Sequence, residues 1–375
     1  MDKCCKVPDF SVKKREMELK GERVTVNKRW RKIIGRILIC AALFTGGLGS
    51  VSCSQAEASV IASEIRVEYS GPASDLPKAS VKGYASGPGV VELAEASENI
   101  EEGYLGGAEL RLLTCADGGQ NLSCVIRTAA GGVIVVDGGR EVDKAHLTEV
   151  IQSMGGRVSA WLLTHPHNDH VGALTEILND ASNPVEIDKI YYSFLENNYY
   201  EQGEHQGRMS DLTNLQAAFQ NIDPAKLYAP VKKGDQILVD DVLITVMNDP
   251  YACPQNTFNN SSVGYRLEVG GKRILFLGDM GWQAGENLLK VCSAKELKAD
   301  VVQMSHHGQA GVKREVYEVI SPEICLWPTP QWLWDNEKSG VAGAGSYKTL
   351  EVRGWMKALG AERHLTMKDG DRILR

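Results

Sequence analysis

Residues 161–172 of this chain read Trp161-Leu-Leu-Thr-His165-Pro-His167-Asn-Asp169-His170-Val-Gly172. The apolar start predicts a buried strand, and four potential metal ligands follow it within six positions. Histidine and aspartate are poor core residues unless they are paired, so packing does not explain why four of them crowd one strand end. The stretch therefore predicts a metal site rather than a set of solvated loop residues.

The spacing within this stretch divides the four side chains between two ions. His165 and His167 can reach one ion if the chain turns at Pro166. Asp169 and His170 lie one turn later, at the predicted start of a helix, where they can reach a second ion. Two neighbouring ions would lower the pKa of a shared water and polarise the bond to be cleaved. Asp169 is therefore a candidate for catalysis as well as for metal binding.

Two further carboxylates follow apolar strands elsewhere in the chain. Asp279 comes after residues 274–277, and each of its oxygens can serve one ion, so we expect it to bridge the pair; alone, it would be interpreted as a turn residue. Asp137 follows residues 133–136. We expect it to accept an imidazole N–H and to fix the tautomer of a metal-binding histidine, with a simple turn as the alternative.

A histidine doublet, Ser305-His306-His307-Gly308, follows the apolar residues 301–304. Adjacent imidazoles point apart, so we do not expect both to bind the same ion. Our interpretation gives His307 to the second ion and His306 to catalysis, through contact with a substrate oxygen or delivery of a proton. The reverse assignment of the two histidines stays open.

The pattern of apolar residues predicts an α/β fold. Alternation over residues 263–269, then Gly270-Gly271 and the apolar run 274–277, predicts a hairpin. Helical spacing occurs over residues 142–154 and 212–219. Strands followed by strand–helix alternation occur twice, which suggests two packed sheets with helices outside, a four-layer αββα sandwich. The other expected strands are 110–113, 124–126, 133–136, 161–163, 190–192, 243–246, 301–302 and 324–327.

The N-terminal residues differ from the rest. A basic lead, an apolar run over residues 37–48 and small residues around Cys53 are typical of an export signal, so we expect an exported bacterial protein at the cell surface or outside the cell. Residues 1–53 are thus a signal peptide or, if uncleaved or lipidated at Cys53, a membrane anchor. Residues 54–104, rich in Ser, Ala, Gly and Glu, are expected to be a flexible acidic linker.

Composition narrows the class of protein. With 43% hydrophobic and 24% charged residues, the chain is an ordinary globular one, and its net charge of −7 argues against a passive nucleic-acid-binding surface. Nothing in it indicates an obligate protein partner. Five of the nine cysteines lie beyond the N-terminal segment, an odd number without a Cys-x-x-Cys pair. We expect mostly buried free thiols, with a Cys115–Cys124 pairing across a hairpin as the alternative.

These motifs resemble the metallo-β-lactamase superfamily from about Leu105 to Arg375. More narrowly, the chain resembles the extracellular hydrolase domain of the DNA-uptake protein ComEC and its stand-alone exported relatives, through Asn259-Asn-Ser-Ser262, Leu-Gly-Asp279, residues 299–308 and 367–370. The first resemblance implies the αββα fold for residues 105–375, two divalent ions (zinc, or alternatively manganese) and hydrolysis by a bridging hydroxide. The second implies a phosphodiester substrate, such as DNA or a cell-wall or lipid phosphate ester.

The sequence also departs from these families. The superfamily usually supplies a further histidine to the first ion, and here His205 is the one available candidate between Gly172 and Asp279. Without it, the first ion would have His165, His167 and the bridge. A histidine–proline pair that ComEC-like sequences carry near their end is replaced by residues 346–349, which puts the substrate in doubt.

Two other functions therefore stay open: hydrolysis of a lactone, thioester or β-lactam, and a cell-surface binding module that has lost turnover. Substrate-binding residues are less readable. Lys313 and Arg314 are candidates for a phosphate contact or a solvated helix face, and the tyrosines around Tyr199 precede an insertion that could lie over the cleft. His146 and His364 are interpreted as structural.

Overall fold

The computed structural model describes residues 18–19, 22–23, 102–204 and 206–375. The predicted signal or anchor and the predicted linker therefore lie almost wholly outside the described residues. Contacts divide the chain into two units, Met1–Val67 and Glu68–Arg375. In the first unit, β1 (Glu18–Leu19) pairs with β2 (Glu22–Arg23) in antiparallel orientation. In the described part of the chain, no helix combines the length and apolar character needed to cross a membrane.

Two seven-stranded sheets form the framework of the second unit. The first has the order β10 (Leu227–Tyr228), β9 (Ile190–Tyr191), β7 (Ala160–Leu162), β5 (Val133–Asp137), β4 (Ser123–Arg127), β3 (Glu109–Leu112), β18 (Arg372–Leu374). The second has the order β11 (Gln236–Val239), β12 (Val242–Val246), β13 (Tyr265–Val269), β14 (Lys272–Phe276), β15 (Val301–Gln303), β16 (Ile324–Trp327), β17 (Arg363–Thr366).

Both sheets follow the same plan. One end is antiparallel, and the pairing becomes parallel beyond β5 in the first sheet and beyond β14 in the second. The predicted hairpin is β13–β14, with Val269 opposite Lys272. Parallel neighbours bring their carboxyl ends to one edge of a sheet, so the loops after β5 and β7 lie together, as do those after β14 and β15.

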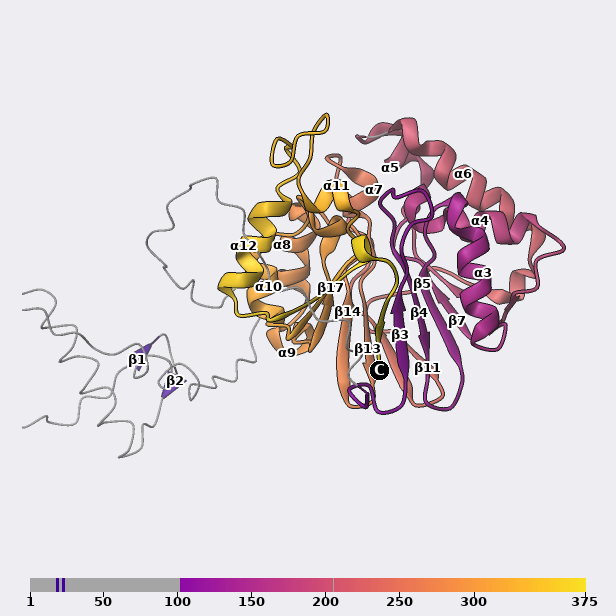
Figure 1. Ribbon diagram of the computed structural model, residues 1–375, viewed down its shortest axis with the longest axis horizontal. Coiled ribbons are helices and arrows are strands. Elements are labelled where there is room, and N and C mark those ends of the chain that lie inside the picture. The colour runs from indigo at the N-terminus through magenta and orange to yellow at the C-terminus, as the bar shows by residue number, and fades with distance from the viewer. Residues whose placement is uncertain (1–17, 20–21, 24–101, 205) are drawn as a thin grey trace, which may run out of the picture. The chain divides into compact units, whose positions relative to one another are not determined.

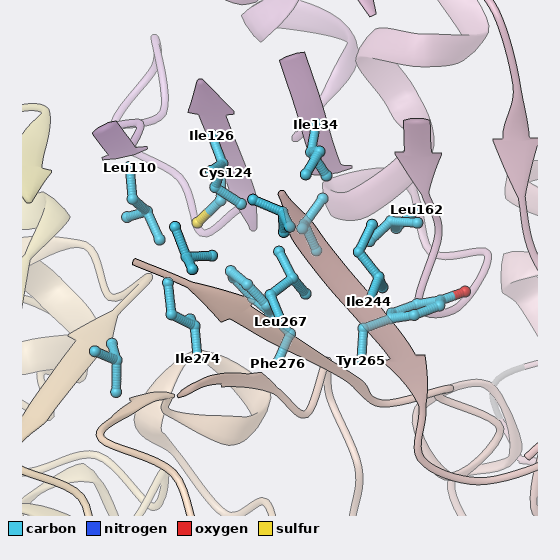
Figure 2. Packing of buried hydrophobic residues seen from close by; sticks show 14 of the residues in the cluster. Leu110, Cys124, Ile126, Ile134, Leu162, Ile244, Tyr265, Leu267, Ile274 and Phe276 are labelled. Carbon is cyan, nitrogen blue, oxygen red and sulfur yellow. The ribbon is translucent and has the colours of Figure 1, made fainter. Parts of the chain in front are cut away.

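Alternation along the strands builds the core between the sheets. In β5, Ile134 and Val136 face the inter-sheet core, whereas Val133 and Val135 pack against helices on the other side. Successive side chains of a strand point to opposite faces, and each large apolar side chain buried in this way contributes about 1.5–3 kcal/mol. Figure 2 shows the two inner faces meeting through Leu110, Cys124, Ile126, Ile134 and Leu162 on one sheet and Ile244, Tyr265, Leu267, Ile274 and Phe276 on the other.

Helices cover the outer face of each sheet, as predicted (Figure 1). The first sheet carries α3 (Lys144–Ser153), α4 (Asn168–Asn179) and α6 (Met209–Ala218), and the second carries α8 (Trp282–Val291), α9 (Ala294–Leu297), α10 (Arg314–Ile320) and α12 (Thr349–Ala358). Three short helices, α5 (Asn197–Gln202), α7 (Thr257–Asn260) and α11 (Gln331–Trp334), lie together at one end (Figure 1).

Two further details concern the C-terminal strand and the cysteines. The C-terminal strand β18 pairs with β3 in the first sheet, whereas β17, the strand before it in sequence, belongs to the second sheet. Cys115 and Cys124 do not form a disulfide; all five cysteines among the described residues are buried free thiols, as the odd number indicated.

Candidate metal centre

The candidate centre lies where four strands end. Asp137 is the last residue of β5, and the loop after β7 begins with Leu163-Thr164-His165. Asp279 follows β14, and the histidine doublet follows β15. The parallel pairs β5–β7 and β14–β15 place these ends at the same edges, so residues scattered over more than a hundred positions meet.

Six side chains converge there in two groups that could each hold a metal ion. One group consists of Asp169, His170, Asp279 and His307, and the other of His165, His167 and Asp279. Within each group the potential ligand atoms all lie within 4.8 Å of one another. These are the two sets that the spacing of the sequence predicts, and Asp279 is common to both.

Separations between ligand atoms fit metal coordination. The Oδ2 atom of Asp279 lies 3.1 Å from Nε2 of His307, 3.3 Å from Nε2 of His170 and 4.0 Å from Nε2 of His165. Two ligands of one tetrahedral zinc ion lie about 3.3 Å apart, given Zn–N and Zn–O distances near 2.0–2.1 Å. The cluster is thus compact enough to coordinate ions without rearrangement.

Buried polar atoms without hydrogen bonds provide a second test of the fit. They include Nε2 of His167, His170 and His307, and Oδ1 of Asp279. Leaving such atoms without a partner costs free energy, and native proteins seldom do so without a reason. Imidazole nitrogens and carboxylate oxygens are the donors that zinc and other divalent transition metals take, so these residues fit a pair of divalent ions.

Asp137 orients His170 directly and His165 through Thr164, and the sequence predicts such a role for it. Its Oδ2 accepts hydrogen bonds from Nδ1 of His170 at 2.7 Å and from the Thr164 hydroxyl at 2.8 Å, and its Oδ1 accepts from the Thr164 backbone N–H at 2.7 Å. Because the Thr164 hydroxyl donates to Asp137, it is left to accept from Nδ1 of His165, 3.1 Å away. Both histidines thereby turn Nε2 towards Asp279, and their neutral rings would offer that atom to a metal ion.

The doublet adopts a strained backbone that separates its two rings. His306 and His307 both have left-handed φ angles, 52° and 55°, which cost on the order of 1–3 kcal/mol each and persist only where surroundings hold them. Here Thr329 Oγ1 donates to the His307 carbonyl at 2.6 Å. The Nδ1 atom of His307 donates to the Pro328 carbonyl at 3.1 Å, which leaves Nε2 for the cluster.

Charges in the cluster compensate one another. Burial would raise the pKa of the Asp279 carboxyl, but His170 and His307 hold that pKa well below its usual range. Burial likewise opposes protonation of His307, but Asp279 and Asp169 raise its pKa to about 9. The site is therefore built to hold positive charge against the buried Asp279 carboxylate and the partly exposed Asp169 carboxylate.

His306 belongs to neither ligand group and lines a cavity beside the cluster. Its Nε2 lies 3.2 Å from Nδ2 of Asn259 on α7, and its Nδ1 lies 3.3 Å from the Ala310 carbonyl. Since the Ala310 carbonyl can only accept, Nδ1 donates and Nε2 accepts from Asn259. The cavity has a volume of about 230 Å³ and is lined by Gln120, His167, Asp169, Arg208, Asn256, Asn259, Asp279 and His306.

The remaining predicted residues lie elsewhere. Lys313 pairs with Glu286, and Arg314 pairs with Glu318. Neither basic residue is among those that line the cavity. His205 lies outside the described residues. Tyr199 is half-exposed on α5 and does not line the cavity either.

The two histidines interpreted as structural have structural contacts. His364 is buried and accepts a hydrogen bond from Nε1 of Trp327 at 3.0 Å, and His146 pairs with Asp371 at 2.9 Å.

Sequence reasoning missed several cavity residues. Gln120 donates to Oδ2 of Asp169 at 2.8 Å, across 49 positions of sequence. Asn259 belongs to a motif that carries the family resemblance, but nothing in the neighbouring sequence predicts its contact with His306. Arg208 ends a short 3-10 helix (Gln206–Arg208) and Asn256 immediately precedes α7. Such residues are common on any surface, so only the fold identifies them.

The chain is similar to one known protein family. A model described as the metallo-beta-lactamase superfamily matches residues 116–320, more than half of the 375-residue chain. A search of curated proteins found no match.

Several solved structures are similar to this chain at low sequence identity. A metallo-beta-lactamase with a HARLDQ motif from Cronobacter sakazakii is 15% identical, with a TM-score of 0.30, over 43% of this chain and 56% of that protein. YhfI from Bacillus subtilis, a metallo-beta-lactamase fold protein, is 12% identical, with a TM-score of 0.43, over 71% and 99% of the two chains. Zn²⁺-bound PqqB from Methylobacterium extorquens is 13% identical, with a TM-score of 0.42, over 72% and 99%. Because the family model matches more than half of this chain, the chain belongs to the metallo-beta-lactamase superfamily, whose members are generally metal-dependent hydrolases.

Proposed function

We propose that this protein is a binuclear metal-dependent phosphodiesterase. The observation that carries the proposal is the sharing of Asp279 between two ligand groups at the edge of a cavity. A shared carboxylate would hold two ions close together, and paired ions are suited to displacement at phosphorus, where the attacking and leaving oxygens both need stabilisation. Zinc is the first choice of metal and manganese the alternative, because imidazole and carboxylate ligands suit both.

Asp169, His170, Asp279 and His307 would hold one ion, and His165, His167 and Asp279 the other. When bound, such ions supply Lewis acidity and bring the pKa of water towards neutral. Gln120 donates to Asp169 and restricts the rotation of that carboxylate. Asp169 thereby takes part in catalysis as a positioned ligand.

His306 is proposed as the group that contacts substrate or transfers a proton. Its Nε2 is at the cavity, outside both ligand groups. Burial lowers the pKa of His306, so the neutral ring can accept a proton at neutral pH. In the free protein Nε2 accepts the Asn259 N–H, so a substrate group or a proton has to replace that hydrogen bond.

The lining of the cavity supports a phosphate ester over a carbonyl substrate. Every described residue that lines it has a polar side chain. Besides the candidate ligands and His306, the lining consists of three neutral amides and one arginine, namely Gln120, Asn256, Asn259 and Arg208. Pockets for drug-sized substrates with apolar groups are lined mainly by apolar and aromatic side chains. The narrower resemblance to the ComEC hydrolase domain, carried by the Asn259–Ser262 motif, supports the same substrate class and stays a proposal.

The test uses the purified full-length protein with zinc or manganese added. We expect two ions per chain by plasma mass spectrometry and turnover of bis(4-nitrophenyl) phosphate. His306→Gln should lower kcat by about 10²–10⁴-fold, the usual contribution of a proton-transferring group. His146→Gln, which removes a histidine paired with Asp371 away from the cavity, is the matched control and should leave kcat unchanged.

Three outcomes would contradict the proposal in different ways. Hydrolysis of nitrocefin or a lactone, without turnover of the phosphodiester, would assign the site to carbonyl chemistry. Fewer than two bound ions and no activity with any substrate would favour a binding module. Equal losses in His306→Gln and His146→Gln would remove His306 from the mechanism.

We also propose that the chain is exported, on the composition of residues 1–58 alone. Expression in a bacterial host, followed by cell fractionation and intact-mass measurement, tests this. A full-length mass in the cytoplasm would contradict it.

A further inference from the structure

One basic residue stands out in the cavity. Of the described residues that line it, Arg208 is the one lysine or arginine. The other lining side chains are candidate metal ligands, His306 and neutral amides. Arg208 therefore adds a positive charge to the cavity lining, and its side chain is 63% exposed and open to solvent.

The backbone is hydrogen-bonded to the site both before and after Arg208 in the sequence. Four residues before it, Glu204 donates its backbone N–H to the Pro254 carbonyl at 2.9 Å and accepts the Asn256 N–H at 2.8 Å through Oε2. Three residues after it, Oδ2 of Asp211 accepts the Asn168 N–H at 3.1 Å.

Those hydrogen bonds join the Arg208 segment to the site itself. Asn168 lies between the candidate ligands His167 and Asp169, and Asn256 lines the cavity. These hydrogen bonds involve backbone groups near the candidate ligands and the cavity, so they hold the backbone around Arg208 close to the site.

The Arg208 guanidinium remains available for a ligand. Among the described residues its ion-pair partner is Asp211, at 3.9 Å, which is longer than a hydrogen bond. The same Asp211 oxygen accepts the Asn168 N–H. Guanidinium groups have several N–H donors arranged to match two oxygens of a phosphate or carboxylate.

We propose that Arg208 binds the anionic oxygen of the substrate phosphate and makes the site select charged diesters over neutral esters. This role rests on the proposed function, since it assumes that a phosphodiester occupies the cavity. Arg208 is then a specificity-determining residue that acts through charge and hydrogen bonding.

A pair of substrates isolates the charge. Bis(4-nitrophenyl) phosphate carries one negative charge, and its methyl triester has the same leaving group and no charge. For Arg208→Met we expect kcat/KM on the diester to fall roughly 10- to 100-fold, the usual effect of losing a charged hydrogen bond, with the triester changed less than about twofold. Arg208→Lys should lose less than Arg208→Met, because it keeps the charge but not the fork.

Arg157→Met is the matched control. Arg157 is 66% exposed and pairs with Asp188, away from the cavity, so this variant should behave as wild type with both substrates. Equal losses on diester and triester in Arg208→Met, or no loss on either, would overturn the proposal.

A binding measurement keeps this test separate from that of the proposed function. Inorganic phosphate is titrated calorimetrically into the metal-loaded full-length protein. Arg208→Met should weaken phosphate binding roughly tenfold or more, and Arg157→Met should not. If wild type hydrolyses neither phosphate compound, the proposed function fails, but weaker phosphate binding by Arg208→Met would still support an anion site. Unchanged phosphate binding would overturn the assignment of Arg208 whatever the activity.

Discussion

The Asp137 carboxylate accepts three hydrogen bonds beside the candidate metal centre. Replacing Asp137 with asparagine tests how it controls the candidate ligand His170. Its two oxygens receive the Thr164 N–H, the Thr164 hydroxyl and Nδ1–H of His170. Asparagine keeps the shape but has one acceptor oxygen, and its NH₂ group occupies the other position. If the amide oxygen stays with the Thr164 N–H, the NH₂ group faces Nδ1 of His170.

His170 must then lose its hydrogen bond or move its proton to Nε2, the atom that faces Asp279. One hydrogen bond to a charged group contributes about 1.5–3 kcal/mol. Loss of such an outer partner usually weakens metal affinity by about 10- to 100-fold, or about 1.4–2.7 kcal/mol. The two ranges agree, so we expect the ion held by His170 to bind about 10- to 100-fold more weakly in Asp137→Asn.

Competition with a chromogenic chelator, on the full-length protein loaded with zinc, measures both dissociation constants. Asp143→Asn is the matched control, because Asp143 is also buried and accepts three hydrogen bonds, from Ala116, Asn121 and Arg140, without touching a candidate ligand. It should destabilise the fold and leave zinc affinity unchanged. Wild-type affinity in Asp137→Asn, or an equal loss in Asp143→Asn, would refute the reasoning.

Three other changes have expected outcomes. Asp279→Ala removes the carboxylate shared by both groups, so the metal content should fall below one ion per chain by plasma mass spectrometry; two retained ions would show that Asp279 is not the bridge. Burial lowers the pKa of His364 to about 4, and the unfolded chain therefore takes up the proton first as pH falls. Stability should drop by about 2 kcal/mol between pH 7.5 and 5 in urea unfolding, and His364→Gln should abolish that His364-dependent part of the loss. Gly308→Ala and Gly118→Ala both place alanine at a left-handed φ, +75° and +74°, but the added Cβ meets the Trp327 ring only at Gly308. Gly118→Ala should cost about 1–2 kcal/mol and Gly308→Ala at least about 1 kcal/mol more, measured by urea unfolding; equal losses would remove steric contact as the cause.

The candidate ligand set could be read from the sequence because its chemistry is conspicuous. Residues 165–170 place three imidazoles and a carboxylate after a buried strand, where packing has no use for them. Asp137 and Asp279 follow apolar runs closely, at positions where each could also be a turn residue, and the ligand-rich stretch 165–170 favoured a role at the metal site for both. Alternation along residues 263–269 likewise determined the strand and its hairpin, since a period of two is a local property of the chain.

Only the tertiary structure decided which ordinary polar residues join the site. Gln120 reaches Asp169, and Asn259 reaches His306, across 49 and 47 positions. Amides and arginines are common on any surface, so their identity carries no signal until the fold brings them to the cavity. The return of β18 to the first sheet is of the same kind. Such pairings depend on how two sheets close around one core, whereas the metal ligands were marked by being unsuitable for any core at all.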